Sequence, residues 1–408
     1  MELMELILAA RMQPRWPAKP AEEHAASLAR VSASRSSQDA IAAFAGGALP
    51  HTILSCCQGA LLGMFSTKAV LPLRATCKDA VTAVAAHPWD DLGTVIHGNV
   101  GPALLPPGPA VQKGAWRGCF PRARGASVTG YRGGWNESGR RKPVVDADFV
   151  HFVGLRRLNM SWCPSVTDTA FLSLTGIQSL TMSWCYQATI TDAAFVHLAG
   201  IKSLDMSHCT QAAITDAAFA PLSGIQSLDM SCCFQNTITD AAFAPLAGIK
   251  SLDMSGCTQA TITDAAFVSL TGIQSLKMRG CTQATVTDAA FVPLAGIQSL
   301  DMSCCFQNTI TDAAFVHLAG IKRLIMSECR QATITDAAFV PLTGIKSLNM
   351  SGCTQATITD AAFVPLAGIQ SLNISWCKQA TITDAAFAPL AGIQSLVMKI
   401  GRASCRER

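Results

Sequence analysis

Cysteine is the residue type in this sequence whose number and spacing could carry chemistry. The chain of 408 residues contains 17 cysteines, enough for a disulfide framework or for thiolate ligands of a metal ion. Ten of them recur at fixed intervals, a first gap of 22 residues followed by gaps of 24. These ten are Cys163, Cys185, Cys209, Cys233, Cys257, Cys281, Cys305, Cys329, Cys353 and Cys377. A constant interval indicates one position of a repeated unit and not a pairing or metal-binding framework.

The elements that would position these cysteines follow from the repeated unit, which reads about L-x-M-S-x-C-x-Q-A-T-I-T-D-A-A-F-x-x-L-x-G-I-x-S. Its SLDMS segment alternates apolar and polar residues, which is the period of a strand. Its TDAAF segment predicts a helix start, with Thr191 as the cap, Asp192 at the positive end of the helix dipole and Gly200 as the stop. A proline two residues after the phenylalanine limits the helix to one or two turns in six copies. One unit cannot bury a core alone, so the copies should stack on one another.

This unit resembles the cysteine-containing class of leucine-rich repeats, whose copies read LxLSxCxxITDxxLxxL. The copy at 158–174, LNMSWCPSVTDTAFLSL, keeps the spacing of that class, and later copies insert two residues after the cysteine. An earlier degenerate copy reads VVDADFVHFVGL. The resemblance implies an α/β solenoid over residues 144–399, an arc with parallel strands on its concave side and short helices on its convex side. It also implies that the repeated cysteines are buried.

Two outward positions vary among the copies: the residue between the leucine and the methionine of the strand, and the residue before the cysteine. We predict that they form a strip that binds a target protein, with aromatic anchors, an acidic stretch and a basic spot. The predicted target-binding residues are Trp162, Trp184, Asp205, His208, Asp229, Asp253, Lys277, Arg279, Asp301 and Trp376. The acidic stretch favours a target with a basic portion. The alternative is drift on a solvated face, since DMSCCFQNTITDAAF occurs identically at 229–243 and 301–315.

The segment at 47–91 resembles an F-box, whose pattern LPxEILxxIFxxL…DLxxLRxVCKxW…LW is matched in part by LPHTILSCCQGALLGMFSTKAVLPLRATCKDAVTAVAAHPWDD. The resemblance implies a small α-helical segment that docks on a Skp-type adaptor of a cullin ubiquitin ligase. The adaptor-binding residues that it implies are Leu49, Pro50, Ile53, Leu54, Leu61 and Leu71. The segment departs from the pattern at Thr52, where an acidic residue is usual, and about four residues are inserted before Val70. The open alternative is a helical cap over the core of the first repeat.

The remaining segments predict no further domain. Residues 1–46 are rich in alanine, serine and arginine and predict a flexible tail, and Glu2 and Glu5 ahead of its apolar run argue against a secretory signal. Residues 92–143 predict a linker with a partial capping element. Residues 400–408, IGRASCRER, share nothing with the repeat and translate codon by codon from a common sequencing-adapter sequence, so we expect them to be adapter-derived. No apolar stretch is long enough to span a membrane.

Charge and motifs narrow the function classes. Residues 1–143 carry a net charge of +7 and residues 144–398 a net charge of −6, without a basic block interleaved with aromatic residues, so nucleic acid is not an expected partner. No catalytic triad, phosphate-binding loop or metal-ligand spacing occurs, so the sequence predicts no enzyme, cofactor or metal. The leading hypothesis is a substrate-recruiting adaptor of a Skp–cullin–F-box ubiquitin ligase in the reducing cytoplasm or nucleus. The alternative is a leucine-rich-repeat interaction scaffold without a ligase role; a secreted receptor is disfavoured by the unpaired cysteines.

Overall fold

The structure is a computed structural model that forms two compact units, residues 1–160 and residues 161–408. It describes residues 82, 84–89, 95–97, 117, 120–129 and 144–398. The predicted tail at 1–46, the six adaptor-binding residues and the segment at 400–408 lie outside the described residues. Within the described ranges, none of the helices has the length and apolar character needed to cross a membrane.

The first unit contains short parallel strands. Its elements are β1 (Val95–His97), β2 (Gly125–Thr129), the 3₁₀ helix η1 (Asp146–Phe152) and β3 (Arg157–Asn159), with β2 pairing with both β1 and β3. The indole of Trp89 is buried, donates a hydrogen bond to the carbonyl oxygen of Val84 at 2.8 Å, and packs edge-on against Phe120 at 5.8 Å between ring centroids. Strands β1 and β2 both fall within the predicted linker at 92–143, so part of that segment has regular structure.

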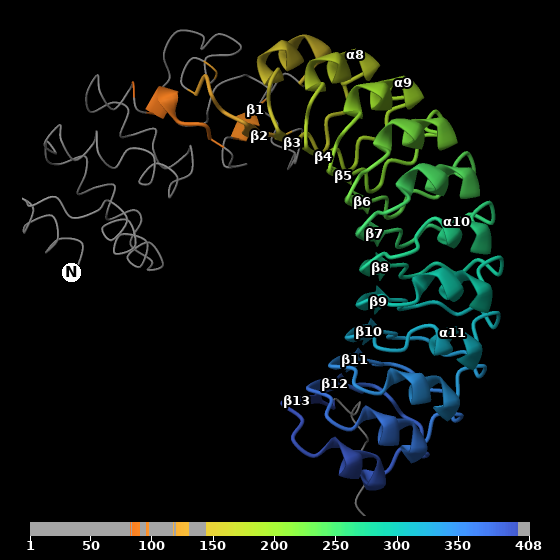
Figure 1. Ribbon diagram of the computed structural model, residues 1–408. Coiled ribbons are helices and arrows are strands. Elements are labelled where there is room, and N and C mark those ends of the chain that lie inside the picture. Colours follow the sequence, from red (N-terminus) through yellow and green to blue (C-terminus); the bar gives the residue numbers. More distant parts are fainter. Residues whose placement is uncertain are drawn as a thin grey trace, which may run out of the picture. The chain divides into compact units, whose positions relative to one another are not determined.

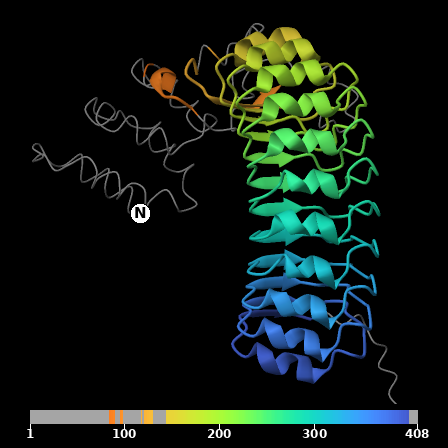
Figure 2. The ribbon, with the colours of Figure 1, turned by 45° about the vertical axis from the view of Figure 1, so that its right-hand side comes forward.

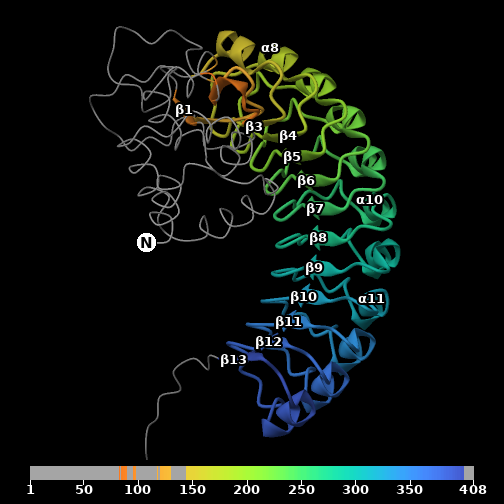
Figure 3. The same ribbon diagram turned by 60° about the vertical axis from the view of Figure 1, so that its left-hand side comes forward.

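The second unit is a regular solenoid in which every repeat contributes one strand and one short helical segment (Figure 1). Its parallel strands are β4 (Ser179–Thr181), β5 (Ser203–Asp205), β6 (Ser227–Asp229), β7 (Ser251–Asp253), β8 (Ser275–Lys277), β9 (Ser299–Asp301), β10 (Arg323–Ile325), β11 (Ser347–Asn349), β12 (Ser371–Asn373) and β13 (Ser395–Val397). These strands follow the inner side of a curve and the helical segments follow its outer side, stacked in one column (Figures 2 and 3). The predicted α/β solenoid with concave strands is therefore confirmed.

The strands of this unit pair without any shift in register. Ser203 lies opposite Ser227, Leu204 opposite Leu228 and Asp205 opposite Asp229, and the same alignment continues through β13. Because corresponding residues of successive repeats lie side by side, each position of the unit forms a continuous row. The inward rows of leucine, methionine, cysteine, isoleucine and phenylalanine are almost completely buried and make up the core.

Each helical segment begins and ends as its sequence predicts. The hydroxyl of Thr191 accepts the backbone N–H of the second helical residue at 3.2 Å. At the other end, Ala199 and Gly200 take φ values of −53° and +83°, and the N–H of Ile201 donates to the carbonyl oxygen of Leu198 at 3.0 Å. This is the geometry of a type II turn, which requires a positive φ at its third residue and therefore favours glycine there.

Proline decides the type of helix in the second unit. The copies without proline form α-helical turns, namely α8 (Asp168–Phe171) and α9 (Asp192–Phe195), each followed by a 3₁₀ turn (η2, Leu172–Leu174; η3, Val196–Leu198), and α10 (Asp264–Val268) and α11 (Asp312–Val316). The six copies with proline are 3₁₀ throughout: η4 (Asp216–Leu222), η5 (Asp240–Leu246), η6 (Asp288–Leu294), η7 (Asp336–Leu342), η8 (Asp360–Leu366) and η9 (Asp384–Leu390). A proline ring clashes with the carbonyl four residues earlier in an α-helix, and the tighter turn avoids that contact.

The helix-start aspartates link each repeat to the next. The sequence of one copy did not predict this contact. Asp264 accepts the backbone N–H of Thr287 with Oδ1 and the hydroxyl of the same threonine with Oδ2, both at 2.7 Å. The same pair of bonds recurs at every junction from Asp168–Thr191 to Asp360–Thr383. We call this series the Asp–Thr ladder. It adds coupling between repeats to the capping and dipole roles predicted for these aspartates.

Replacing Asp264 with alanine is expected to lower the free energy of unfolding by about 2–4 kcal/mol, because two hydrogen bonds to a charged group are lost at an internal junction. A urea titration followed by circular dichroism measures the change. Asp384 is the matched control, since no such bond to a following threonine is present in the described residues. We expect Asp384→Ala to cost about 1 kcal/mol or less, through capping and dipole effects alone. Equal losses in the two variants would contradict a role for the ladder.

Candidate functional site

The residue before each repeat cysteine occupies the third position of a tight turn. In the turn from Met182 to Cys185 the N–H of Cys185 donates to the carbonyl oxygen of Met182 at 3.2 Å, and Trp184 has a φ of +62°. All the residues at this position have φ values between 58° and 72°. They form what we call the turn row: Trp162, Trp184, His208, Cys232, Gly256, Gly280, Cys304, Glu328, Gly352 and Trp376.

The left-handed backbone of the turn row was not predicted, although the three glycines at this position were a signal for it. Glycine adopts a positive φ without strain, whereas a residue with a side chain pays roughly 1–2 kcal/mol. This conformation sets the direction of the side chains in the row.

Three aromatic rings of the turn row stack on one another at the N-terminal end of the second unit. The ring centroids of Trp162 and Trp184 are 4.7 Å apart with an interplanar angle of 10°. Those of Trp184 and His208 are 3.7 Å apart with an angle of 11°. Trp184 is 37% exposed, and the neighbouring Tyr186 is 55% exposed. Because strands lie about 4.8 Å apart, in-register aromatic residues on adjacent repeats can stack in this way.

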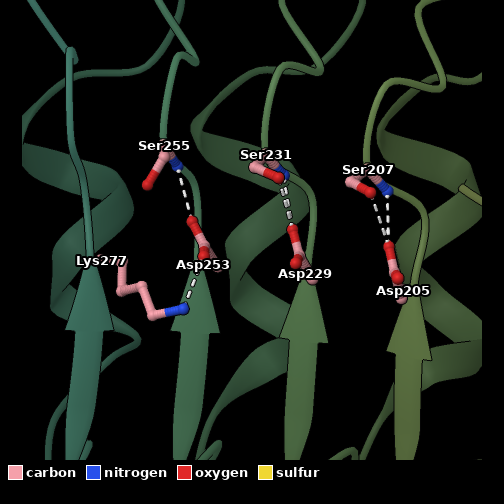
Figure 4. Close-up of polar contacts among 7 residues, drawn as sticks. All are labelled: Asp205, Ser207, Asp229, Ser231, Asp253, Ser255 and Lys277. Atoms are coloured by element: carbon pink, nitrogen blue, oxygen red, sulfur yellow. Dashed lines mark hydrogen bonds and ion pairs between the residues drawn. The ribbon is translucent and has the colours of Figure 1, made fainter.

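The second variable position lies at the end of each strand and forms what we call the strand-end row. In this row Asp205 accepts both the N–H and the hydroxyl of Ser207 with Oδ1, at 3.0 and 2.7 Å (Figure 4). Asp229 accepts from Ser231 in the same way, at 2.9 and 2.7 Å. These aspartates therefore close the chain turn that follows the strand, a structural role that the sequence analysis missed. Ser207, which donates both bonds to Asp205, is buried.

The acidic stretch of the strand-end row is only partly neutralised. The ammonium group of Lys277 donates to Oδ2 of Asp253 at 3.0 Å, and this hydrogen bond and ion pair raise the pKa of Lys277 (Figure 4). Burial raises the pKa of the Asp229 carboxyl, and the neighbouring charges of Asp253 and Asp205 raise it further. Three adjacent carboxylates thus face one lysine on the concave side.

The other predicted residues of the strip lie farther along the rows. Arg279 is exposed next to Lys277, and Asp301 accepts the N–H and hydroxyl of Ser303 with Oδ1 on the far side of that lysine. Trp376 is 50% exposed near the other end of the turn row. The structure therefore brings nine of the predicted residues onto consecutive repeats and leaves Trp376 beyond them; the nine are Trp162, Trp184, His208, Asp205, Asp229, Asp253, Lys277, Arg279 and Asp301. Their part in binding stays a prediction.

Nine of the ten repeat cysteines, from Cys163 to Cys353, are buried in the core, and Cys377 is half-buried. The thiol of Cys233 donates to the carbonyl oxygen of Met206 at 3.2 Å, and from Cys209 to Cys377 every repeat cysteine makes the equivalent contact with the preceding repeat. Burial raises the pKa of Cys233 to about 12. Cys232 and Cys304, in the turn row, are half-buried. Among the residues that the structure describes, no group of three or more histidine, cysteine, aspartate or glutamate side chains could hold a metal ion.

Comparison with known proteins supports the fold alone. No protein-family model matches the sequence, and no curated protein matches it. Of the solved structures, that of a TLR13–ssRNA13 complex superposes with a TM-score of 0.53 at 19% identity, over 69% of this chain and 40% of that one. The mouse RP105/MD-1 complex gives a TM-score of 0.49 at 17% identity, over 69% of this chain and 48% of that one. The chain thus spans less than half the length of these leucine-rich-repeat proteins. The likeness to the TLR13 structure is one of fold alone.

Proposed function

We propose that this solenoid with a leucine-rich-repeat fold is a protein-binding module whose concave face contacts a target protein. The observation that carries the proposal is the half-exposed stack of Trp162, Trp184 and His208 beside the carboxylates of the strand-end row. Tryptophan and tyrosine on a rigid surface are the residues that most often anchor protein interfaces. In-register stacking holds these side chains in place before binding, which lowers the entropy cost of association.

Tagged full-length protein tests this proposal by capture of its target from a cell lysate. We expect the double variant Trp162→Ser and Trp184→Ser to lose a specifically bound protein while its circular dichroism stays unchanged. The matched control is Phe306→Ser, which removes an aromatic side chain that is 50% exposed and lies outside the predicted strip. Retention of every specifically bound protein by the double variant would argue against the concave strip.

We further propose that the protein recruits substrates to a Skp–cullin–F-box ubiquitin ligase. The support is the resemblance of residues 47–91 to an F-box that precedes repeats similar to the cysteine-containing leucine-rich class. The predicted adaptor-binding residues themselves lie outside the described part of the chain. In this proposal the N-terminal segment binds a Skp-type adaptor and the repeats present the target. The half-buried thiols of Cys232 and Cys304 favour the reducing cytoplasm or nucleus as its compartment.

Co-purification with a Skp-type adaptor separates this proposal from the alternative, an interaction scaffold without a ligase role. We expect the adaptor to co-purify with the full chain, and to be lost from the double variant Leu49→Asp and Ile53→Asp. The target captured through the concave face should remain bound to that variant. Capture of the target without any adaptor would leave the scaffold as the function.

A further inference from the structure

We propose that the aromatic stack and the adjoining carboxylates of the second unit bind an arginine side chain on an extended segment of the target protein. The site consists of Trp184 and His208 in the turn row and of Asp205, Asp229 and Asp253 in the strand-end row. This inference rests on the proposed protein-binding function and names the chemical class of the partner. The contacts, the charge and the open space around these residues argue for it in turn.

The two rows meet at this end of the concave face. Ser207 donates its N–H and hydroxyl to the Asp205 carboxylate, and the carbonyl oxygen of the same serine accepts the N–H of Trp184 at 2.9 Å. The N–H of His208 donates to the carbonyl oxygen of Ser231 at 2.8 Å, and Ser231 in turn donates to the Asp229 carboxylate. One serine therefore connects the backbone of Trp184 with the Asp205 carboxylate, and another connects the backbone of His208 with the Asp229 carboxylate.

The strand-end row carries negative charge that a cation of the partner can neutralise. Asp205, Asp229 and Asp253 lie opposite one another in register on β5, β6 and β7. Lys277 on β8 bonds Asp253 through Oδ2, whereas the hydrogen bonds of the Asp205 and Asp229 side chains go to Oδ1 alone. The lysine of this chain therefore shows how an amino group binds the outer carboxylate oxygen. A cation from a partner can make the same contact with the two remaining aspartates.

The aromatic stack favours arginine over lysine as that cation. A guanidinium group is planar, stacks on aromatic faces and binds a carboxylate through two parallel hydrogen bonds, whereas an ammonium group acts as a point charge. Trp184 is covered by Trp162 on one face and by His208 on the other, so a guanidinium would stack on the face of His208 that points away from Trp184. The carboxylates of Asp205 and Asp229 lack a basic partner among the described residues. An arginine can satisfy both kinds of group at once.

The turn row leaves room for the backbone of the partner. Beyond His208 the row continues with Cys232, Gly256 and Gly280, so its side chains are small or absent opposite Asp229, Asp253 and Lys277. A Cβ atom placed on Gly280 would meet no heavy atom within 4 Å, whereas one placed on Gly256 would lie 3.2 Å from Sγ of Cys232, so the open space lies at Gly280. An extended peptide can therefore run along the concave face from the aromatic stack toward β8.

Calorimetric titration of the full chain with three synthetic peptides tests the inference. The peptides alternate glycine with arginine, with lysine, or with citrulline, which keeps the shape of arginine without its charge. We expect the arginine peptide to bind about tenfold more tightly than the lysine peptide, and the citrulline peptide to bind more weakly still. Binding should weaken as salt is raised, because surface charges are screened.

A pair of matched variants locates the site. Asp229→Asn keeps the cap on Ser231, as Asn349 caps Ser351 at 3.0 Å, but removes the charge. Asp301→Asn makes the same change in an identical stretch of sequence, next to Lys277 and away from the aromatic rings. We expect Asp229→Asn to weaken binding of the arginine peptide about fivefold or more, and Asp301→Asn to change it less than about twofold.

Equal binding of the arginine and lysine peptides, or equal losses in the two variants, would overturn the arginine site. Failure of every peptide to bind would overturn it as well. None of these results contradicts the proposed protein-binding function, which is tested by whether the double variant Trp162→Ser and Trp184→Ser loses a captured protein. If that loss occurs without any peptide binding, the concave face binds its target through other chemistry.

Discussion

Replacing Phe267 with alanine is expected to lower the free energy of unfolding by about 3–5 kcal/mol. Phe267 lies in helix α10 and is completely buried, and its equivalents are buried in the repeats on both sides. Its removal leaves a cavity at two junctions at once, because each repeat supplies part of its neighbour's core. Urea unfolding followed by circular dichroism measures the loss, together with the midpoint and slope of the transition.

The matched control for this prediction is Phe387→Ala in the last described repeat. Phe387 is only half-buried and contacts Phe363 across a single junction, at 6.3 Å between ring centroids. We expect it to cost less than about 2 kcal/mol, because the apolar area removed from water is smaller. A central cavity can also split unfolding into two steps, since contacts in a solenoid extend only to the nearest repeats. A loss at position 267 no larger than that at 387 would contradict the shared core.

The cysteines of the native protein are expected to fall into two classes of reactivity. Cys232 and Cys304 should react with iodoacetamide at pH 8, whereas Cys233 should stay unmodified until the protein unfolds. Burial raises the pKa of Cys233 from its ordinary value of 9.0 to about 12, which lowers its thiolate fraction at pH 8 about a thousandfold. Burial also keeps the reagent away from its sulfur. Mass spectrometry of proteolytic peptides measures both classes in one sample.

Adjacent residues provide the internal control for this experiment. Cys232 and Cys233 are neighbours in sequence, so differences in digestion or recovery affect both equally. The pKa of Cys232 is also raised, by partial burial and by the charges of Asp229 and Asp253, and its labelling should therefore become faster as the pH rises above 8. Labelling of Cys233 at the rate of Cys232 in the native state would contradict the buried position of the repeat cysteines.

The parts of the fold that follow from one copy of the repeat could be predicted from the sequence. Alternation in the SLDMS segment, the capping threonine and the glycine stop each depend on local chemistry, and the structure places a strand, a short helix and a turn where they indicate. The predicted burial of the repeat cysteines is confirmed for nine of the ten, whereas Cys377 is half-buried. Contacts between copies could not be predicted in this way. The bond from Asp264 to Thr287 and the cap of Asp205 on Ser207 depend on the register between strands and on the exact turn.

The contacts within the candidate site could likewise not be predicted from the sequence. The sequence indicates which positions vary and that Trp162, Trp184 and His208 share one row. It does not indicate that their rings stack, because the stacking depends on the left-handed backbone of the turn. The strand-end aspartates illustrate the opposite case, since a residue predicted to bind a partner also closes its own turn. The predicted adaptor-binding residues, from Leu49 to Leu71, lie outside the described part of the chain and stay a prediction.

The sameness of the junctions has an evolutionary consequence. Every junction from Asp168–Thr191 to Asp360–Thr383 uses the same donors, acceptors and core rows, so any repeat can follow any other. Gain or loss of whole units by unequal recombination therefore needs no compensating mutation. The length of the concave face can change in steps of one unit, and new combinations of surface residues can be sampled without risk to folding.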